Sequence, residues 1–194
     1  MGEPLKNSAD EPYVVTASLI REWWSSLQES NQAGTRAALR RARTPNEISV
    51  QYEYFNLFRK LTDSKLPDFI KKRLSYRLPL VAGILSHIRE DEPSRPAAAR
   101  MGSSDKPGGD RPLVSDLRFR RLLRTEDDNE LFLMMIRMIR MLGDRVNVKD
   151  TAMSVFFWNE QTRKKWASLY YLKRDIYSIQ EVSENNSTKK GEEK

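Results

Sequence analysis

Apolar residues along this chain recur at spacings of three and four, the period of an amphipathic helix, and no segment alternates as a strand does. Segment 13–29 is an example, since it carries a broad apolar face made of Leu19, Ile20, Trp23, Trp24 and Leu27. The longest uninterrupted apolar run, 131–136, ends at Arg137 and falls far short of the roughly 20 residues that a membrane span needs. The pattern therefore predicts an all-α protein without a membrane-spanning helix.

Helix caps and helix breakers divide this pattern into elements. We expect helices at about 13–29, 35–43, 45–61, 65–90, 115–124, 130–142, 147–158 and 160–179. Thr44, Pro45 and Glu47 form a capping box with proline at the first helical position, and Ser115 and Asn147 are expected caps. Pro79 lies inside the fourth helix and should kink or divide it.

Residues 91–113 differ in composition from both flanking regions. They contain four prolines and three glycines with little apolar content, which is typical of a flexible linker or long loop. We therefore predict two small helical bundles joined by a Pro/Gly-rich loop, an N-terminal bundle at 13–90 and a C-terminal bundle at 114–180. Residues 1–12 are expected to form a loose arm and the charged tail 181–194 to be disordered.

Composition excludes several kinds of chemistry. The chain has no cysteine, so disulfides and thiolate zinc sites are ruled out, and His87 is its only histidine. Asp127, Asp128 and Glu130 could bind magnesium, but a charged cap at the start of an apolar helix explains them more simply. The sequence shows no phosphate-binding loop motif and no signal peptide is expected. We therefore predict a soluble, cytoplasmic protein without catalysis, metal or cofactor.

The feature of the sequence that points to a function is its arginine content. The net charge is +7 and the pI is about 9.6, which suggests a polyanionic partner. The 21 arginines outnumber the 13 lysines and gather in two clusters, at 36–43 and 118–124, each on a short helix with an apolar back. A guanidinium is a planar fork that matches phosphate oxygens. The alternative to phosphate binding is a solvated face whose arginines pair with carboxylates. The tryptophans are better explained by core packing than by base stacking.

The same residues resemble the CasB family, the small subunit of the type I-E CRISPR complex called Cascade. The best stretch is 115–123 (SDLRFRRLL), followed by the Leu131 helix with Arg137 and Arg140. The first half agrees through 36–42 (RAALRRA) and 81–85 (VAGIL). The order and spacing of these pieces, which span about residues 15–172, carry the resemblance.

The resemblance implies a non-catalytic helical subunit for antiviral defence. Such a subunit pairs with a second copy of itself and with other Cascade subunits. It supports the guide RNA and the target DNA, including the displaced strand, and stabilises the R-loop without a membrane. Because the guide reads sequence, the protein needs only a sequence-independent charged track. The residues expected to bind nucleic acid are Arg36, Arg40, Arg41, Lys71, Lys72, Arg111, Arg118, Arg121, Arg124, Arg163 and Lys164.

Two other classes of function stay open at this stage. A helix-turn-helix DNA-binding regulator would need a recognition helix after a tight turn. The short helix at 35–43 could be imagined in that role, but the helix after it is aromatic and core-like. A helical adaptor or a peripheral membrane binder would also suit a basic helical chain.

Overall fold

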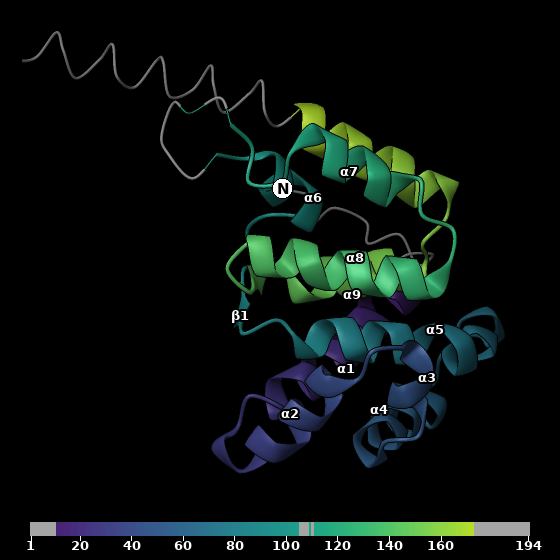
Figure 1. The fold of residues 1–194 in the computed structure, drawn as a ribbon. Helices are drawn as coiled ribbons and strands as arrows, with labels where there is room; N and C mark the ends of the chain where they lie inside the picture. Colours follow the sequence, from purple (N-terminus) through teal and green to yellow (C-terminus); the bar gives the residue numbers. More distant parts are fainter. Residues whose placement is uncertain (1–10, 105–108, 110, 173–194) are drawn as a thin grey trace, which may run out of the picture.

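The computed structural model describes residues 11–104, 109 and 111–172 (Figure 1). The first elements are α1 (Glu11–Ser26), a 3-10 helix (Ser30–Gln32), α2 (Ala33–Arg41), α3 (Pro45–Ser49), α4 (Tyr52–Thr62) and α5 (Asp68–Ser86). Then follow β1 (Glu90–Asp91), α6 (Ala97–Gly102), α7 (Asp116–Leu123), α8 (Asp128–Met141), β2 (Arg145–Val146), α9 (Val148–Phe156) and a C-terminal helix over 160–172. The predicted all-α class is confirmed. The expected arm at 1–10 and the expected tail at 181–194 lie outside the described residues.

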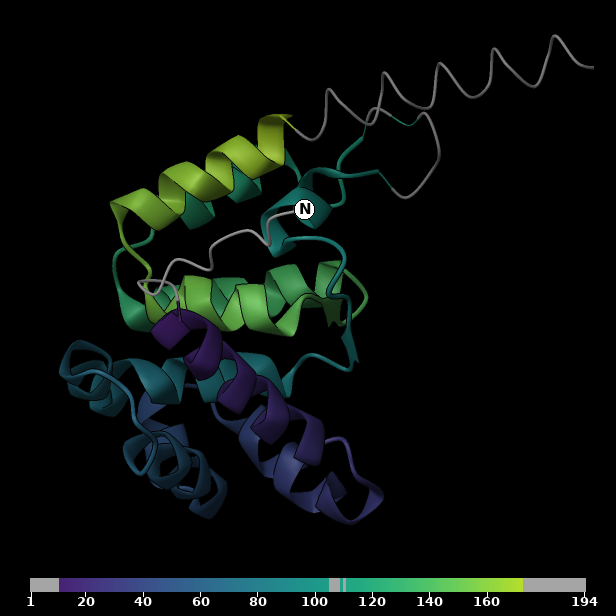
Figure 2. The same cartoon turned by 180° about the vertical axis from the view of Figure 1, so that it is seen from behind.

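The helices are stacked in layers. In Figure 1, α7 and the C-terminal helix lie together at one end, α8 and α9 form the next layer, and α5 follows. Helices α2, α3 and α4 lie at the opposite end, and Figure 2 shows α1 running from the α8–α9 layer toward α2. The two strands pair in parallel through Glu90 with Arg145 and Asp91 with Val146. Two residues per strand are too few to leave an alternating pattern in the sequence.

Helix α5 is the centre of the core. Its residues from Arg77 to Ser86 are all buried, because α2, α3, α4, α8 and α9 pack around it. The buried apolar side chains form one cluster that takes members from both halves of the chain, from Ile20 to Tyr170. The two helical halves therefore share a core, and the division of the chain at 91–113 stays a prediction.

Gly83 lets α5 and α8 approach each other closely. A Cβ atom built on Gly83 would lie 2.5 Å from Cε2 of Phe132 and 3.0 Å from Cγ1 of Ile48. Real Cβ atoms do not approach carbon this closely, and Phe132 and Ile48 are themselves fully buried. The absence of a side chain at position 83 therefore sets the spacing of the two helices.

Two of the three expected helix caps are confirmed. The Thr44 hydroxyl accepts a hydrogen bond from the Glu47 amide at 3.4 Å, and the Asn147 side chain accepts one from the Asp150 amide at 2.9 Å. Ser115 occupies the N-cap position of α7, but its side chain makes no capping hydrogen bond, so that expected cap is wrong. Gly143 follows α8 with φ +70°, the left-handed conformation that glycine adopts without strain.

One expectation about helix continuity is wrong, and of the kink or division expected at Pro79 the division does not occur. The helix expected at 45–61 is two helices, α3 and α4, separated by Gln51 in an extended conformation. The side-chain Nε2 of Gln51 donates to the carbonyl of Ala38 on α2 at 3.5 Å, so a tertiary contact accompanies the break. Pro79 does not divide α5, which continues to Ser86. The carbonyl that Pro79 leaves without a donor belongs to Ser75, which is exposed and can bind water.

Part of the segment expected to be a loop is a buried helix. The side chains of Ala97, Ala98, Ala99 and Met101 on α6 are buried. The Asp150 carboxylate accepts a hydrogen bond from the Ala97 amide at 2.8 Å, which satisfies one free donor at the start of α6. Three alanines add little to the apolar content of the sequence, but their small side chains suit close packing.

Replacing Gly83 with alanine tests the close contact of α5 and α8. Alanine is the better helix former by about 1 kcal/mol, yet overpacking a rigid core costs about 1–3 kcal/mol, so Gly83→Ala should lower the stability. Gly34 on α2 has no atom within 4 Å of an added Cβ, so Gly34→Ala should keep or raise the stability. Denaturant unfolding of both variants measures the difference. A Gly83→Ala protein as stable as Gly34→Ala would contradict the prediction.

Candidate nucleic-acid interface

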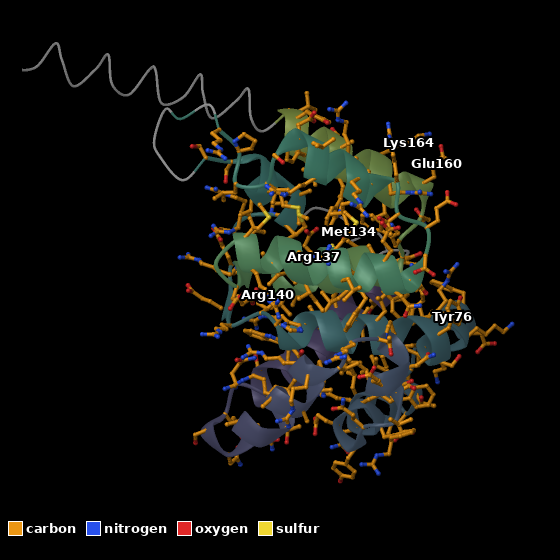
Figure 3. All side chains as sticks on the ribbon, viewed as in Figure 1. Tyr76, Met134, Arg137, Arg140, Glu160 and Lys164 are labelled. Carbon is orange, nitrogen blue, oxygen red and sulfur yellow. The ribbon has the colours of Figure 1, made fainter. Side chains whose placement is uncertain are left out.

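A groove between α7 and α8 brings together four exposed arginines. Its volume is about 480 Å³, and it is lined by Arg118, Arg121, Met134, Arg137, Met138, Arg140 and Met141. The α8 members recur at spacings of three and four, which places them on one side of that helix. Figure 3 shows Met134, Arg137 and Arg140 in succession along α8, with α7 above them.

The arginines of this groove are poorly neutralised. Arg121 pairs with Glu130 at 3.3 Å, but its side chain remains 71% exposed, so the pair is weak. Within the described part of the chain, no carboxylate lies at ion-pair distance from Arg118, Arg137 or Arg140, all of which are exposed. Four cations with one carboxylate among them leave a positive field along the groove.

The outer side of α7 forms a second, smaller hollow. It has a volume of about 300 Å³ and is lined by Leu117, Arg120, Arg121 and Arg124. Arg120 pairs with Asp116 at 2.7 Å, whereas no carboxylate of the described residues pairs with Arg124. Phe119 and Leu122 are fully buried behind these arginines, as the apolar back of the predicted cluster requires. Helix α7 therefore presents arginines on both sides of its exposed face.

Two of the three predicted arginines on α2 make hydrogen bonds within the fold. Arg36 donates to the Leu27 carbonyl at 2.6 Å, and Arg40 donates to the Ser86 carbonyl at 2.6 Å at the end of α5. Burial lowers the pKa of Arg40, and nearby Arg89 and Arg36 add to this effect. Arg41 is exposed. These bonds use part of the donor capacity of Arg36 and Arg40 to hold helix ends.

The other predicted residues are scattered. Arg163 donates to the Leu123 carbonyl at 3.4 Å and lies 3.7 Å from the Glu126 carboxylate, so it connects the C-terminal helix to the end of α7. Lys164 pairs with Glu160 at 2.6 Å, and both side chains project at the start of that helix in Figure 3. Lys72 and Arg111 are exposed and Lys71 is half-buried. The structure does not bring these residues into the α7–α8 groove.

Arg137 and Arg140 were missing from the predicted binding residues. They interrupt the apolar pattern of α8 and do not belong to a cluster of adjacent arginines, which is the pattern that carries the prediction. The sequence feature that could have identified them is their spacing of three, which places both on one side of a helix, next to methionines. Their contribution depends on α7, which supplies the opposite wall of the groove.

His87 is buried near two arginines, Arg140 on α8 and Arg40 on α2. It is 7% exposed at the end of α5, and its Nε2 atom has no hydrogen-bond partner among the described residues. Burial, followed by the charges of Arg140 and Arg40, lowers its pKa from 6.5 to about 4, while Asp144 opposes this shift. His87 is therefore neutral near pH 7 and belongs to the packing of the core.

The described residues offer no obvious metal site. They contain no group of three or more His, Asp or Glu side chains placed to hold a metal ion. Asp127 accepts a hydrogen bond from the Glu130 amide at 2.8 Å, and Asp128 pairs with Arg77. Two of the three acidic residues considered as magnesium ligands thus serve the start of α8. No helix among the described residues is long and apolar enough to cross a bilayer.

The fold and these surfaces define a class of protein, a small all-helical chain whose accessible arginines gather on neighbouring helices. The chain belongs to the family of CRISPR-associated protein Cse2, whose family model matches residues 35–171. The resemblance to the CasB family is thereby confirmed, and membership implies a subunit of the CRISPR Cascade complex. Comparisons with curated proteins and with solved structures gave no match.

The buried histidine predicts a loss of stability in acid. The unfolded chain takes up a proton at His87 near pH 6.5, whereas the folded protein does so only near pH 4. The stability that neutral His87 contributes is therefore complete above pH 6.5 and is lost as the pH falls toward 4, by up to about 3 kcal/mol. Denaturant unfolding across this range should show the decline, and His87→Gln should reduce its slope. Identical pH profiles for both proteins would refute this assignment.

Proposed function

We propose that this chain is a non-catalytic Cascade subunit that binds nucleic acid through phosphates, independently of base sequence. In a type I-E complex it would support the guide RNA and the target DNA, including the displaced strand, and stabilise the R-loop. The observation that carries the proposal is the α7–α8 groove, where Arg118, Arg137 and Arg140 have no carboxylate partner among the described residues. Contacts with a second copy and with other Cascade subunits, in the cytoplasm, belong to the same proposal.

Unpaired arginines on rigid helices suit this function. A guanidinium stays charged at any physiological pH and can donate two parallel hydrogen bonds to one phosphate. Phosphate contacts position a protein on nucleic acid and carry no sequence information themselves. A complex whose guide RNA does the reading requires this kind of contact.

The alternative of a helix-turn-helix regulator has less support. Its candidate recognition helix is α2, on which Arg36 and Arg40 donate to backbone carbonyls of the protein. A recognition helix needs such side chains free to reach base edges in the major groove. Of the predicted arginines on α2 only Arg41 is exposed, whereas α7 and α8 together carry several exposed arginines.

Removing charge from the groove should weaken binding and spare the fold. Arg118 and Arg121 are exposed, so replacing both with alanine should cost within about 0.5 kcal/mol per site. The affinity for nucleic acid should fall, as should the stability of the R-loop in the assembled complex. The matched control is Arg59→Ala with Lys65→Ala, which removes the same charge from exposed positions elsewhere. A melting curve and a binding titration on one preparation separate the two effects.

Two results of this comparison would count against the site. Early unfolding of the Arg118→Ala/Arg121→Ala protein would make these arginines structural. Equal weakening by the control pair would mean that net charge, and not the groove, governs binding.

Binding should depend strongly on salt and little on sequence. If about five phosphates are neutralised, a plot of log affinity against log salt concentration should have a slope of roughly −4 to −5 on duplex DNA. Titrations of two unrelated duplexes at several salt concentrations provide the measurement. A slope near zero, or a strong preference for one duplex, would exclude a sequence-independent phosphate track.

A further inference from the structure

The α7–α8 groove has a second property that phosphate binding does not require. Between its arginine walls lie Met134, Met138 and Met141 from three successive turns of α8. Met134 and Met138 are 4% and 3% exposed and form the floor, whereas Met141 is half-buried at its end. The groove therefore combines cationic walls with an apolar, polarisable floor.

We propose that this groove binds a single-stranded stretch of nucleic acid, with phosphates on its arginines and at least one unstacked base on its methionines. The proposal rests on the proposed function and adds that the groove contacts a base as well as phosphates. It assigns the base contact to Met134, Met138 and Met141, and the phosphate contacts to Arg118, Arg121, Arg137 and Arg140.

The floor is chemically suited to a base. A thioether sulfur makes favourable contacts with aromatic rings, and the flexible methionine side chain adapts to different ring shapes. The apolar stems of the flanking arginines extend this floor, while their charged heads remain available to phosphates. These contacts accept any base, because every base has a π-face. The groove can therefore be sequence-independent and still distinguish bases from bare phosphates.

The size of the groove favours a flat group over bulkier occupants. A volume of about 480 Å³ lies in the range of pockets for small ligands. A helix of a partner protein is roughly 10–12 Å across with its side chains and would need a larger groove. A duplex keeps its bases stacked in its interior, so it can offer the arginines its phosphates but cannot offer the methionines a base.

The test compares three ligands by fluorescence anisotropy with the full chain. They are an oligothymidylate, an abasic strand of equal length and charge, and a duplex. One base held on the floor should make the intact strand bind about fivefold or more tightly than the abasic strand, at the lower end of what base stacking contributes. Equal affinities of the unaltered protein for the intact and the abasic strand would overturn the proposal without any substitution.

Substitutions then test whether the preference for the intact strand comes from the methionine floor of the groove. Met141→Gln keeps the length of the side chain at a half-buried position but adds a polar amide, so it should reduce the preference for the intact strand at least twofold. Met153→Gln on α9, also half-buried and outside the groove, is the matched control and should leave the preference unchanged. Arg118→Gln should weaken binding of intact and abasic strands by the same factor. Melting curves check that each variant is folded.

The outcomes separate this proposal from the proposed function. If salt-dependent binding persists but the preference for bases is absent, or if Met153→Gln reduces it as much as Met141→Gln, the inference is wrong and the phosphate track stands. If neither strand binds, the proposed function itself fails.

Discussion

The close packing of α5 against α8 is the contact on which the rest of the molecule depends. Gly83 brings its backbone against the ring of Phe132, and a Cβ atom there would lie 2.5 Å from that ring. Around this contact the second half of α5 is buried on all sides, with α9 and α8 on one side and α2, α3 and α4 on the other. Because interiors are close-packed, the spacing of two central helices fixes where every outer helix can lie.

The functional surface follows from how α8 is placed. Its apolar positions meet α5 through Phe132, while Met134 and Met138 point toward α7. Helix α7 is itself held by the stacking of Phe119 on Tyr170 of the C-terminal helix, with ring centroids 3.9 Å apart. The groove therefore lies between one helix fixed by the core and one fixed by an aromatic contact. Its arginines are positioned by backbone elements, so little ordering of loops would accompany binding.

The arginines of this chain have two roles: some bind groups within the fold, and others remain available to a ligand. Arg77 is buried, pairs with Asp128 and donates to the Phe156 carbonyl at 3.3 Å, so it joins α5 to the start of α8 and the end of α9. Arg40 likewise holds the end of α5 through the Ser86 carbonyl. Arg118 and Arg137, in contrast, have no such partner in the described chain. A basic composition alone cannot separate the arginines that complete the fold from those that remain available to a ligand.

The sequence by itself determined the helical class, most helix positions and the arginine face of α7, because periodicity, caps and local charge are properties of neighbouring residues. The Thr44 cap and the buried Phe119–Leu122 side of α7 were predictable on this basis. Only the tertiary structure decided that α3 and α4 separate at Gln51, that α6 is buried, and that Arg36 and Arg40 bind carbonyls outside their own helix. The groove belongs to the same category, since Arg118 on α7 and Arg137 on α8 meet only when both helices pack on a common core. Local patterns specify each helix, whereas contacts between distant segments specify which of its side chains remain free.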